Sequence, residues 1–469
     1  MEYTELSAYD LPPGVVTTWT PATDAACWQQ DPRAISPSHE QHLAQGETGS
    51  WIGGVMRIPA PLVAETLIRT LRAWYARHEA LRADVVREDD AWKRRIVAAQ
   101  DITVDHVVHG EQDSASVHET IADYFTTVSP LAWPHCVFAT VATPGDEGFT
   151  LAFGADHSVM DAYSQLLWFD EIASLYGRAA AGESDAALAV TGSASYLDHA
   201  HDERGSSDRL TADAPAVERW RAFLSSPEYD GLAFPAFPGL GPVDGPTAEI
   251  GIPRPRGVLR QASFSTPLAD AEQTHVFNQL CKAGGSSLQN GVFAAMAHVL
   301  QQQHGINRLR FVVPMHTRMS IEHATAVGWY VGLCPVDVDL AEEKPLSDLL
   351  GHVHSEVSAN RDLVPHPFAR IMELTELEEG PKFAVSYIDG RFIPGADSWD
   401  EWQGRALRSP AYADDEVYLW FGRQSSGLNV SARYPETVAA EHAMRDMVSG
   451  ISRLIDEITA SVRQGVATA

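Results

Sequence analysis

The sequence predicts an α/β protein with mixed sheets, folded as two lobes. In the first half, residues 149–155 are mostly apolar or small, which is typical of a buried strand, and an apolar helical pattern follows over 162–178. In the second half, the order strand, helix, helix, strand extends from 260 to 313. A polar stretch at 201–216 separates these patterns and marks the expected lobe boundary.

Composition excludes several classes of protein. The chain has 469 residues, enough for two to four domains or two large lobes. Its net charge of −29 disfavours nucleic acid and anionic membranes as partners. No apolar run approaches the roughly 18 residues that a membrane span needs. The acidic N-terminus lacks a signal-peptide pattern, so we expect a cytoplasmic protein.

The cysteines predict neither a metal site nor a disulfide framework. There are four, they lie far apart, and they form no Cys-x-x-Cys motif: Cys27, Cys136, Cys281 and Cys334. This usage fits a reducing compartment, and we expect no metal.

The first half is expected to begin with an irregular arm over 1–50, whose Trp19 and Trp28 pack on the body. The strands and helices expected after it are strands at 51–58, 91–97, 104–108 and 135–142, a helix opened by Pro61, a helix around 117–125, and a turn at 144–148 that makes a hairpin. We take 1–205 as the N-terminal lobe.

The C-terminal lobe is taken as 206–469. Its expected elements are helices at 217–224, 270–283, from Ser286 or Ser287 onward, and 437–463, a loop at 235–255, strands at 260–266, 309–313 and 382–389, and a hairpin near 417–434. We expect this hairpin to cross to the first lobe.

The turn after the strand at 149–155 carries the residues best suited to chemistry. His157 follows the strand, and Asp161 stands where a helix N-cap is expected. The segment resembles the His-His-x-x-x-Asp-Gly signature of the condensation-domain superfamily, which is related to chloramphenicol acetyltransferase. His157 matches the second His and Asp161 the Asp, whereas Asp156 and Ala162 replace the first His and the Gly.

Further segments carry the same resemblance along nearly the whole chain. They are Arg-His-Glu-Ala-Leu-Arg at 77–82, Tyr-Leu-Asp-His-Ala at 196–200, Pro-Met-His-Thr-Arg at 314–318, Val-Gly-Trp-Tyr-Val-Gly at 327–332 and Pro-Phe at 367–368. In the first of these, we expect the charged residues around His78 to tie a helix to the sheet. Gly332 stands where the family has Asn, so that side chain is absent here.

The resemblance implies a fold and a branch. The fold is two chloramphenicol-acetyltransferase-like lobes with an active-site tunnel between them. The opening arm, with Pro13-Gly14 and Trp19-Thr20-Pro21, is similar to that of actinobacterial polyketide-associated (Pap-type) acyltransferases. The plant branch carries Asp-Phe-Gly-Trp-Gly, which is absent here; residues 419–423 read Leu-Trp-Phe-Gly-Arg. With no carrier-protein or adenylation segment attached, a free-standing enzyme of secondary metabolism is expected.

The resemblance assigns roles to individual residues. His157 is the expected general base, because an imidazole titrates near neutrality and takes a proton from an attacking hydroxyl or amine. No Gly-x-Ser-x-Gly elbow suggests an acyl-enzyme. Asp161 is expected to act structurally, as a cap and as the charge partner of Arg318 across the lobe interface. The candidate substrate-tunnel residues are Asp156, Trp329, Tyr330, Tyr387 and Trp420.

The expected donor is a thioester, either acyl-CoA or a phosphopantetheinyl carrier protein, with no bound cofactor. Both donors are anionic, and the one visible basic cluster is Lys93-Arg94-Arg95. The acceptor is a small molecule: a sugar, an alcohol or an amine. Three functions stay open: an ester-forming acyltransferase, an amide-forming enzyme of nonribosomal peptide type, and a non-catalytic member that docks a carrier protein.

Overall fold

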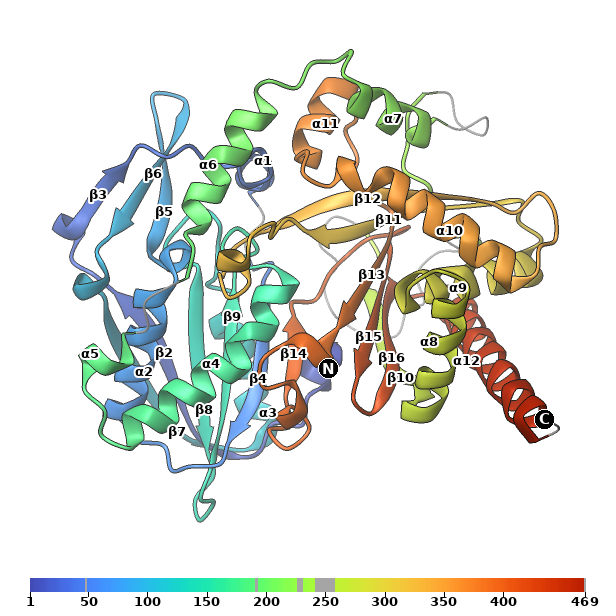
Figure 1. The fold of residues 1–469 in the computed structure, drawn as a ribbon. Helices are drawn as coiled ribbons and strands as arrows, with labels where there is room; N and C mark the ends of the chain where they lie inside the picture. The colour runs from blue at the N-terminus through green and yellow to red at the C-terminus, as the bar shows by residue number, and fades with distance from the viewer. Residues whose placement is uncertain (47–48, 190–192, 226–230, 241–257, 468–469) are drawn as a thin grey trace.

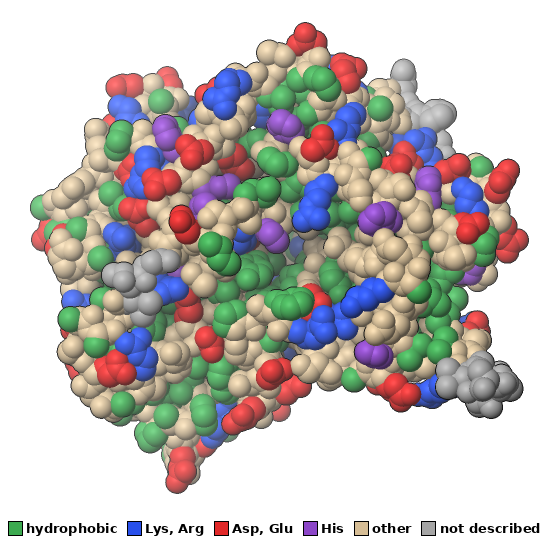
Figure 2. All heavy atoms as spheres, in the orientation of Figure 1, with side chains coloured by type: hydrophobic (Ala, Val, Ile, Leu, Met, Phe, Trp, Pro, Cys, Tyr) green, Lys and Arg blue, Asp and Glu red, His purple; other side chains and the backbone are tan. Residues whose placement is uncertain are grey.

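The computed structural model describes residues 1–46, 49–189, 193–225, 231–240 and 258–467. Two large mixed sheets form two lobes that lie side by side, and a smaller third sheet lies at the outer edge of the first lobe (Figure 1). The predicted two-lobed α/β fold is therefore confirmed. Figure 2 shows that the face in view is hollowed near its centre, where the lobes meet.

The first lobe is built on a sheet of seven strands among the described residues. Their order across the sheet is β1 (Tyr3–Glu5), β14 (Arg405–Arg408), β4 (Ile52–Ile58), β9 (Phe149–Ala155), β8 (Cys136–Ala142), β2 (Gly14–Ala22) and β7 (Thr103–Gln112). Because successive side chains of a strand alternate between faces, each face carries an apolar layer. Helices α2 (Ala64–Arg77) and α4 (Ala162–Ala180) cover one face, and α3 (Ser114–Phe125) covers the other. The small sheet holds β3 (Trp28–Asp31), β6 (Ala91–Val97) and β5 (Ala83–Glu88).

The second lobe is built on six strands among the described residues. Their order is β10 (Gln261–Asp270), β16 (Gly427–Pro435), β15 (Val417–Gln424), β13 (Phe383–Asp389), β11 (Arg308–His316) and β12 (Val331–Asp339). The core lies between this sheet and the helices α8 (Ala271–Ala283), α9 (Leu288–His304), α10 (Leu346–Asn360) and α12 (Val438–Ala467). Part of the opposite face is covered by α7 (Pro215–Leu224) and α11 (Phe368–Thr375). The remaining α-helices are α1 (Pro37–Gln45), α5 (Asp185–Leu188) and α6 (Tyr196–Ser207).

Helix starts follow local sequence. The side chain of Asp161 caps α4 by accepting a hydrogen bond from the amide of Ser164, as predicted. Asp270 forms a reciprocal capping box with Gln273 at α8. Helix α2 begins at Ala64, three residues after the predicted start at Pro61.

The prediction of an irregular arm over 1–50 is wrong. Strand β2 lies inside the first sheet, between β8 and β7, and helix α1 follows in the same segment. The run Val-Val-Thr-Thr-Trp in β2 is rich in residues that favour strands, and neighbouring strands pair with both of its edges. Trp19 packs on the body as expected, because it is 1% exposed and its indole donates to Thr140 Oγ1 at 3.0 Å.

The prediction that the hairpin near 417–434 crosses to the first lobe is also wrong. Strands β15 and β16 pair with each other and with β13 and β10, all in the second sheet. Their apolar side chains, such as Leu419, Phe421 and Val430, belong to the second-lobe core, which holds the hairpin there. The strand that crosses is β14, which pairs with β4 and β1 of the first sheet. Of the expected loop at 235–255, residues 241–255 lie outside the described residues.

No helix among the described residues is both long and apolar enough to cross a membrane. The division of the chain at residue 205 stays a prediction. Residues 405–408 pair with strands of the first sheet, although they come from the part of the chain that was assigned to the C-terminal lobe.

Candidate active site

The loop from Asp156 to Asp161 joins β9 to α4 and is held at both ends. The backbone amide of Asp156 donates to the carbonyl of His135 at 2.7 Å, in the first lobe. The amide of Asp161 donates to the carbonyl of Gly328 at 3.0 Å, in the second half of the chain. The loop is therefore a joint between the two halves, and the position of His157 depends on both.

His157 is partly exposed, and its two ring nitrogens differ. Nδ1 is buried and has no hydrogen-bond partner, which leaves Nε2 on the accessible side. The ring packs against Trp329, with 4.6 Å between centroids. Burial, and then the charge of His42, lower the pKa of His157 below its usual value of 6.5. A neutral imidazole with one accessible nitrogen has the form that a general base needs.

The expected contact between Asp161 and Arg318 is present. Arg318 Nη1 donates to Asp161 Oδ2 at 2.7 Å and Nη2 to Oδ1 at 3.0 Å, so the pair is bidentate. The backbone amide of Tyr330 donates to Oδ2 at 3.0 Å. Burial raises the pKa of Asp161, but the charge and hydrogen bonds of Arg318 outweigh it, and the net pKa lies below 3.8. Asp161 is thus a buried, ionised anchor with no free oxygen for substrate.

Arg318 also binds groups beyond Asp161. Its Nη2 donates to Ser164 Oγ at 2.7 Å and to the carbonyl of Ala326 at 3.2 Å. Its guanidinium lies over the rings of Tyr330 and Tyr163, at 4.4 and 4.8 Å from their centroids. The start of α4 and the segment at 326–330 are therefore clamped together through one arginine.

The expected tunnel residues fall into separate places. Trp329 is partly exposed beside His157, whereas Tyr330 is fully buried against Arg318. Asp156 is also fully buried, so it forms no accessible wall. Tyr387 packs against the second-lobe core. Trp420 stacks on Tyr3 of β1, with 5.7 Å between centroids, and so contacts the first lobe.

Trp329 therefore lies against His157, and Tyr330 lies against Asp161. Among the described contacts, neither Tyr387 nor Trp420 touches His157 or Asp161. On neighbouring strands, Tyr387 lies opposite Phe421 and Ser386 lies opposite Trp420. Side chains alternate along a strand, so Tyr387 and Trp420 point to opposite faces of the sheet. The tunnel and its lining stay predictions.

Sequence reasoning missed His42, which lies on α1. Its Nε2 lies 3.1 and 3.2 Å from the two carboxylate oxygens of Asp156. Burial raises the pKa of Asp156, but hydrogen bonds from His42 and Ser158 outweigh it and lower the pKa to about 2. The only local signal was the helix pattern that Ser36 caps, and nothing in it pointed to Asp156.

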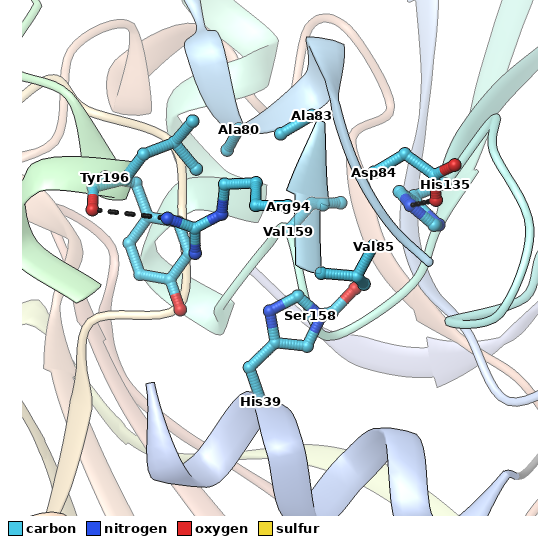
Figure 3. A pocket seen from close by; sticks show the side chains of 11 residues that line it. His39, Ala80, Ala83, Asp84, Val85, Arg94, His135, Ser158, Val159 and Tyr196 are labelled. Carbon is cyan, nitrogen blue, oxygen red and sulfur yellow. Dashed lines mark hydrogen bonds and ion pairs between the residues drawn. The ribbon is translucent and has the colours of Figure 1, made fainter. Parts of the chain in front are cut away.

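A small cavity of about 10 Å³ is lined in part by Ser158 and Val159 of the loop, and His39 and Arg94 point into it (Figure 3). Arg94 is 3% exposed, Arg95 donates to Asp84 at 2.6 Å, and Lys93 pairs with Glu88 at 3.2 Å. The cluster Lys93-Arg94-Arg95 is thus divided between the interior and ion pairs. It does not form a free basic patch that could bind an anionic donor.

His78 ties helix to helix. Its Nε2 lies 2.7 Å from Glu171 of α4, and the indole of Trp74 donates to the same carboxylate at 3.0 Å. His78 thus joins two helices and not a helix to the sheet; within the segment, Arg82 makes the contact with a sheet, because its Nη1 donates to the carbonyl of Val97 in β6 at 2.5 Å.

Gly332 has no space for a side chain, and this predicts a packing effect. A Cβ there would lie 1.9 Å from the carbonyl oxygen of Val364, a backbone atom that cannot simply turn away. We expect Gly332→Asn to lower the free energy of unfolding by about 1–3 kcal/mol, because overpacking forces the backbone to shift. Chemical denaturation measures the change. Gly351→Asn is the matched control, since a Cβ at Gly351 meets nothing within 4 Å. Equal stability of both variants would contradict the prediction.

The chain is similar to a known protein family and to characterised enzymes. The Condensation domain family matches residues 40–387. The chain is 24% identical over 98% of its length to the 2'-acyl-2-O-sulfo-trehalose (hydroxy)phthioceranyltransferase PapA1 of Mycobacterium tuberculosis (strain CDC 1551 / Oshkosh), covering 89% of that protein. It is 23% identical over 98% of its length to the trehalose-2-sulfate acyltransferase PapA2 of Mycobacterium tuberculosis (strain ATCC 25618 / H37Rv), covering 99% of that protein.

Solved structures show the same fold. The PapA2 acyl transferase superposes with a TM-score of 0.84 at 20% identity, over 98% of this chain and 100% of that one. The X-domain from teicoplanin biosynthesis superposes with a TM-score of 0.67 at 15% identity, over 92% and 96%. The family match covers most of the chain, and the full-length relatives are acyltransferases. The chain therefore belongs to the condensation-domain family, and it is an acyltransferase similar to the Pap-type enzymes.

Proposed function

We propose that this acyltransferase moves an acyl group from a thioester to a hydroxyl group of a sugar or another alcohol, with His157 as the general base. The observation that carries the proposal is the state of His157. Its Nε2 is accessible, the ring is positioned by a loop that both halves of the chain hold, and burial lowers its pKa, which favours the neutral ring. No other residue in the 156–161 loop combines these properties, because Asp156 and Asp161 are buried in ion pairs.

The chemistry needs little more. His157 Nε2 accepts the proton of the acceptor hydroxyl as its oxygen attacks the thioester carbonyl. The C–O bond forms, the C–S bond breaks, and the sulfur leaves as a thiolate that must be protonated. Attack is direct, so no serine or cysteine nucleophile is required. The donor is a substrate, either acyl-CoA or an acyl group on a phosphopantetheinyl carrier protein.

The names of the relatives favour a sugar acceptor. PapA2 is a trehalose-2-sulfate acyltransferase, and PapA1 acts on a 2'-acyl-2-O-sulfo-trehalose. At 23–24% identity, this supports the class of acceptor and leaves its identity to experiment. The alternatives are an amide-forming enzyme and a non-catalytic module that docks a carrier protein.

One assay separates the three functions. Purified protein is supplied with an acyl-CoA, and free thiol is followed in the presence of trehalose, a simple alcohol or a primary amine. Mass spectrometry identifies the product. We expect thiol release that depends on the sugar or the alcohol, with an ester as product. An amide product alone would favour the second function. No acceptor-dependent release from acyl-CoA or from an acylated carrier protein would favour the docking module and overturn the proposal.

A further inference from the structure

A second histidine lies in the same site as His157, and it has the carboxylate partner that His157 lacks. His42 Nε2 is held by both oxygens of Asp156, a side chain with no exposed surface. Asp156 directly precedes His157 in the loop, and its carboxylate is fixed from the other side by the amide of Ser158 at 2.8 Å. The pair is therefore built into the loop that positions the proposed base.

His42 and His157 share a surface. The ring of His42 packs edge-on against Trp329, with 5.6 Å between centroids, and the ring of His157 packs against the same indole at 4.6 Å. With Nε2 engaged, His42 has one other nitrogen, Nδ1, which is neither hydrogen-bonded nor buried. Each histidine thus offers one accessible nitrogen beside Trp329: Nδ1 of His42 and Nε2 of His157.

The two histidines have different partners. A buried carboxylate lies against Nε2 of His42 and fixes which of its nitrogens faces the protein interior and which faces the accessible side. His157 has no carboxylate on its buried Nδ1, and the charge of His42 further lowers the pKa of His157. Two histidines in one site, one held by a carboxylate and one without such a partner, are suited to divide the roles of acid and base.

We propose that His42, held by Asp156, is the general acid that protonates the leaving thiolate while His157 accepts the proton of the acceptor hydroxyl. In the step, the hydroxyl oxygen bonds to the carbonyl carbon and its proton goes to His157 Nε2. The C–S bond breaks, and the sulfur takes the proton from His42 Nδ1. His157 ends protonated and His42 neutral. One proton exchanged with solvent at each ring restores the starting state, so the reaction is balanced. This inference rests on the proposed thioester chemistry.

Leaving-group dependence tests the assignment. His42→Gln keeps a side-chain amide that can bond Asp156 but removes the acid. With an alkyl thioester such as an acyl-CoA, the thiolate is basic and needs protonation, so we expect turnover to fall by about 10²-fold. With an aryl thioester of the same acyl group, the thiolate leaves without a proton, and the loss is expected to shrink at least tenfold.

His39→Gln is the matched control on the same helix. His39 lies one turn before His42, is buried, and points into the small cavity lined in part by Ser158 and Val159 (Figure 3). Damage to α1 alone would reduce turnover equally with both donors, and we expect that pattern for His39→Gln. Asp156→Asn should show the same preference for the aryl donor as His42→Gln, to a smaller extent.

The outcomes are distinct. If wild-type protein releases thiol from neither donor, the proposed function itself fails. If the wild type is active but His42→Gln loses the same factor with both donors, His42 is a structural residue and the inference is overturned. Full activity of His42→Gln with the alkyl donor would overturn it as well. A loss confined to the alkyl donor, with an unchanged melting temperature, supports it.

Discussion

Replacing His157 with alanine is expected to reduce turnover by about 10²–10⁴-fold, because the acceptor hydroxyl then loses the group that takes its proton. The protein should stay folded, since the buried Nδ1 of His157 bonds no other residue and the ring is partly exposed. The measurement is thiol release at saturating acyl donor, alongside the melting temperature. His106→Ala is the matched control, because His106 is exposed on the first sheet, where it stacks on Trp19.

The pH profile gives an independent check on His157. A base works only when it is deprotonated, and the pKa of His157 is lowered from 6.5 by burial and by the charge of His42. Wild-type activity should therefore stay high as pH falls through 6.5 and be lost only below it. The variant should lack this acidic limb in its residual activity. Near-normal turnover of His157→Ala would remove the catalytic assignment.

Breaking the pair between Asp161 and Arg318 is expected to destabilise the protein most. Asp161 is 1% exposed and Arg318 is 8% exposed, so either residue alone would leave an uncompensated buried charge. We expect Asp161→Ala and Arg318→Ala each to lower the free energy of unfolding by about 3–5 kcal/mol. Activity should fall in both variants, because the hydrogen bond from the amide of Asp161 to the carbonyl of Gly328 holds one end of the loop that carries His157.

A double-mutant cycle separates this pairing from two independent roles. The double variant should lose less stability than the sum of the single variants, because neither charge is stranded. If Asp161 were a simple cap, the losses of the two single variants would add in the double variant, because Arg318 would then act only through Ser164, Ala326 and the two tyrosine rings. Arg308→Ala is a matched control, since Arg308 forms an exposed bidentate-type pair with Asp337 in the second lobe. That variant should lose about 1 kcal/mol or less.

Local sequence was sufficient for the centre of the site. The apolar run at 149–155, the histidine after it and the cap at Asp161 all depend on neighbours within a few residues, so their patterns predicted β9, the loop and α4. The contact between Asp161 and Arg318 also followed, although it joins residues 157 positions apart. It followed from the family resemblance at 314–318 and not from spacing.

Other features depend on contacts between distant residues. The irregular arm predicted over 1–50 contains strand β2, whose Val-Val-Thr-Thr-Trp run favours a strand, and its place inside the sheet is set by β8 and β7, about a hundred positions away. The strand that crosses is β14 and not the predicted hairpin, because β14 is a run of four residues whose pairing partners lie in the other half of the chain. A strand as short as β14 owes its place in the sheet to its pairing partners more than to propensity.

The sequence by itself thus determined the two-lobed α/β class, the strand–loop–helix that presents His157, and the cap that begins α4. Tertiary structure alone decided that α1 brings His42 onto Asp156, that Trp329 lies against both histidines, and that Asp156 is buried. The physical reason is that strands and caps are fixed by periodicity and local hydrogen bonds. The charge state of a site depends instead on which distant side chains are buried together.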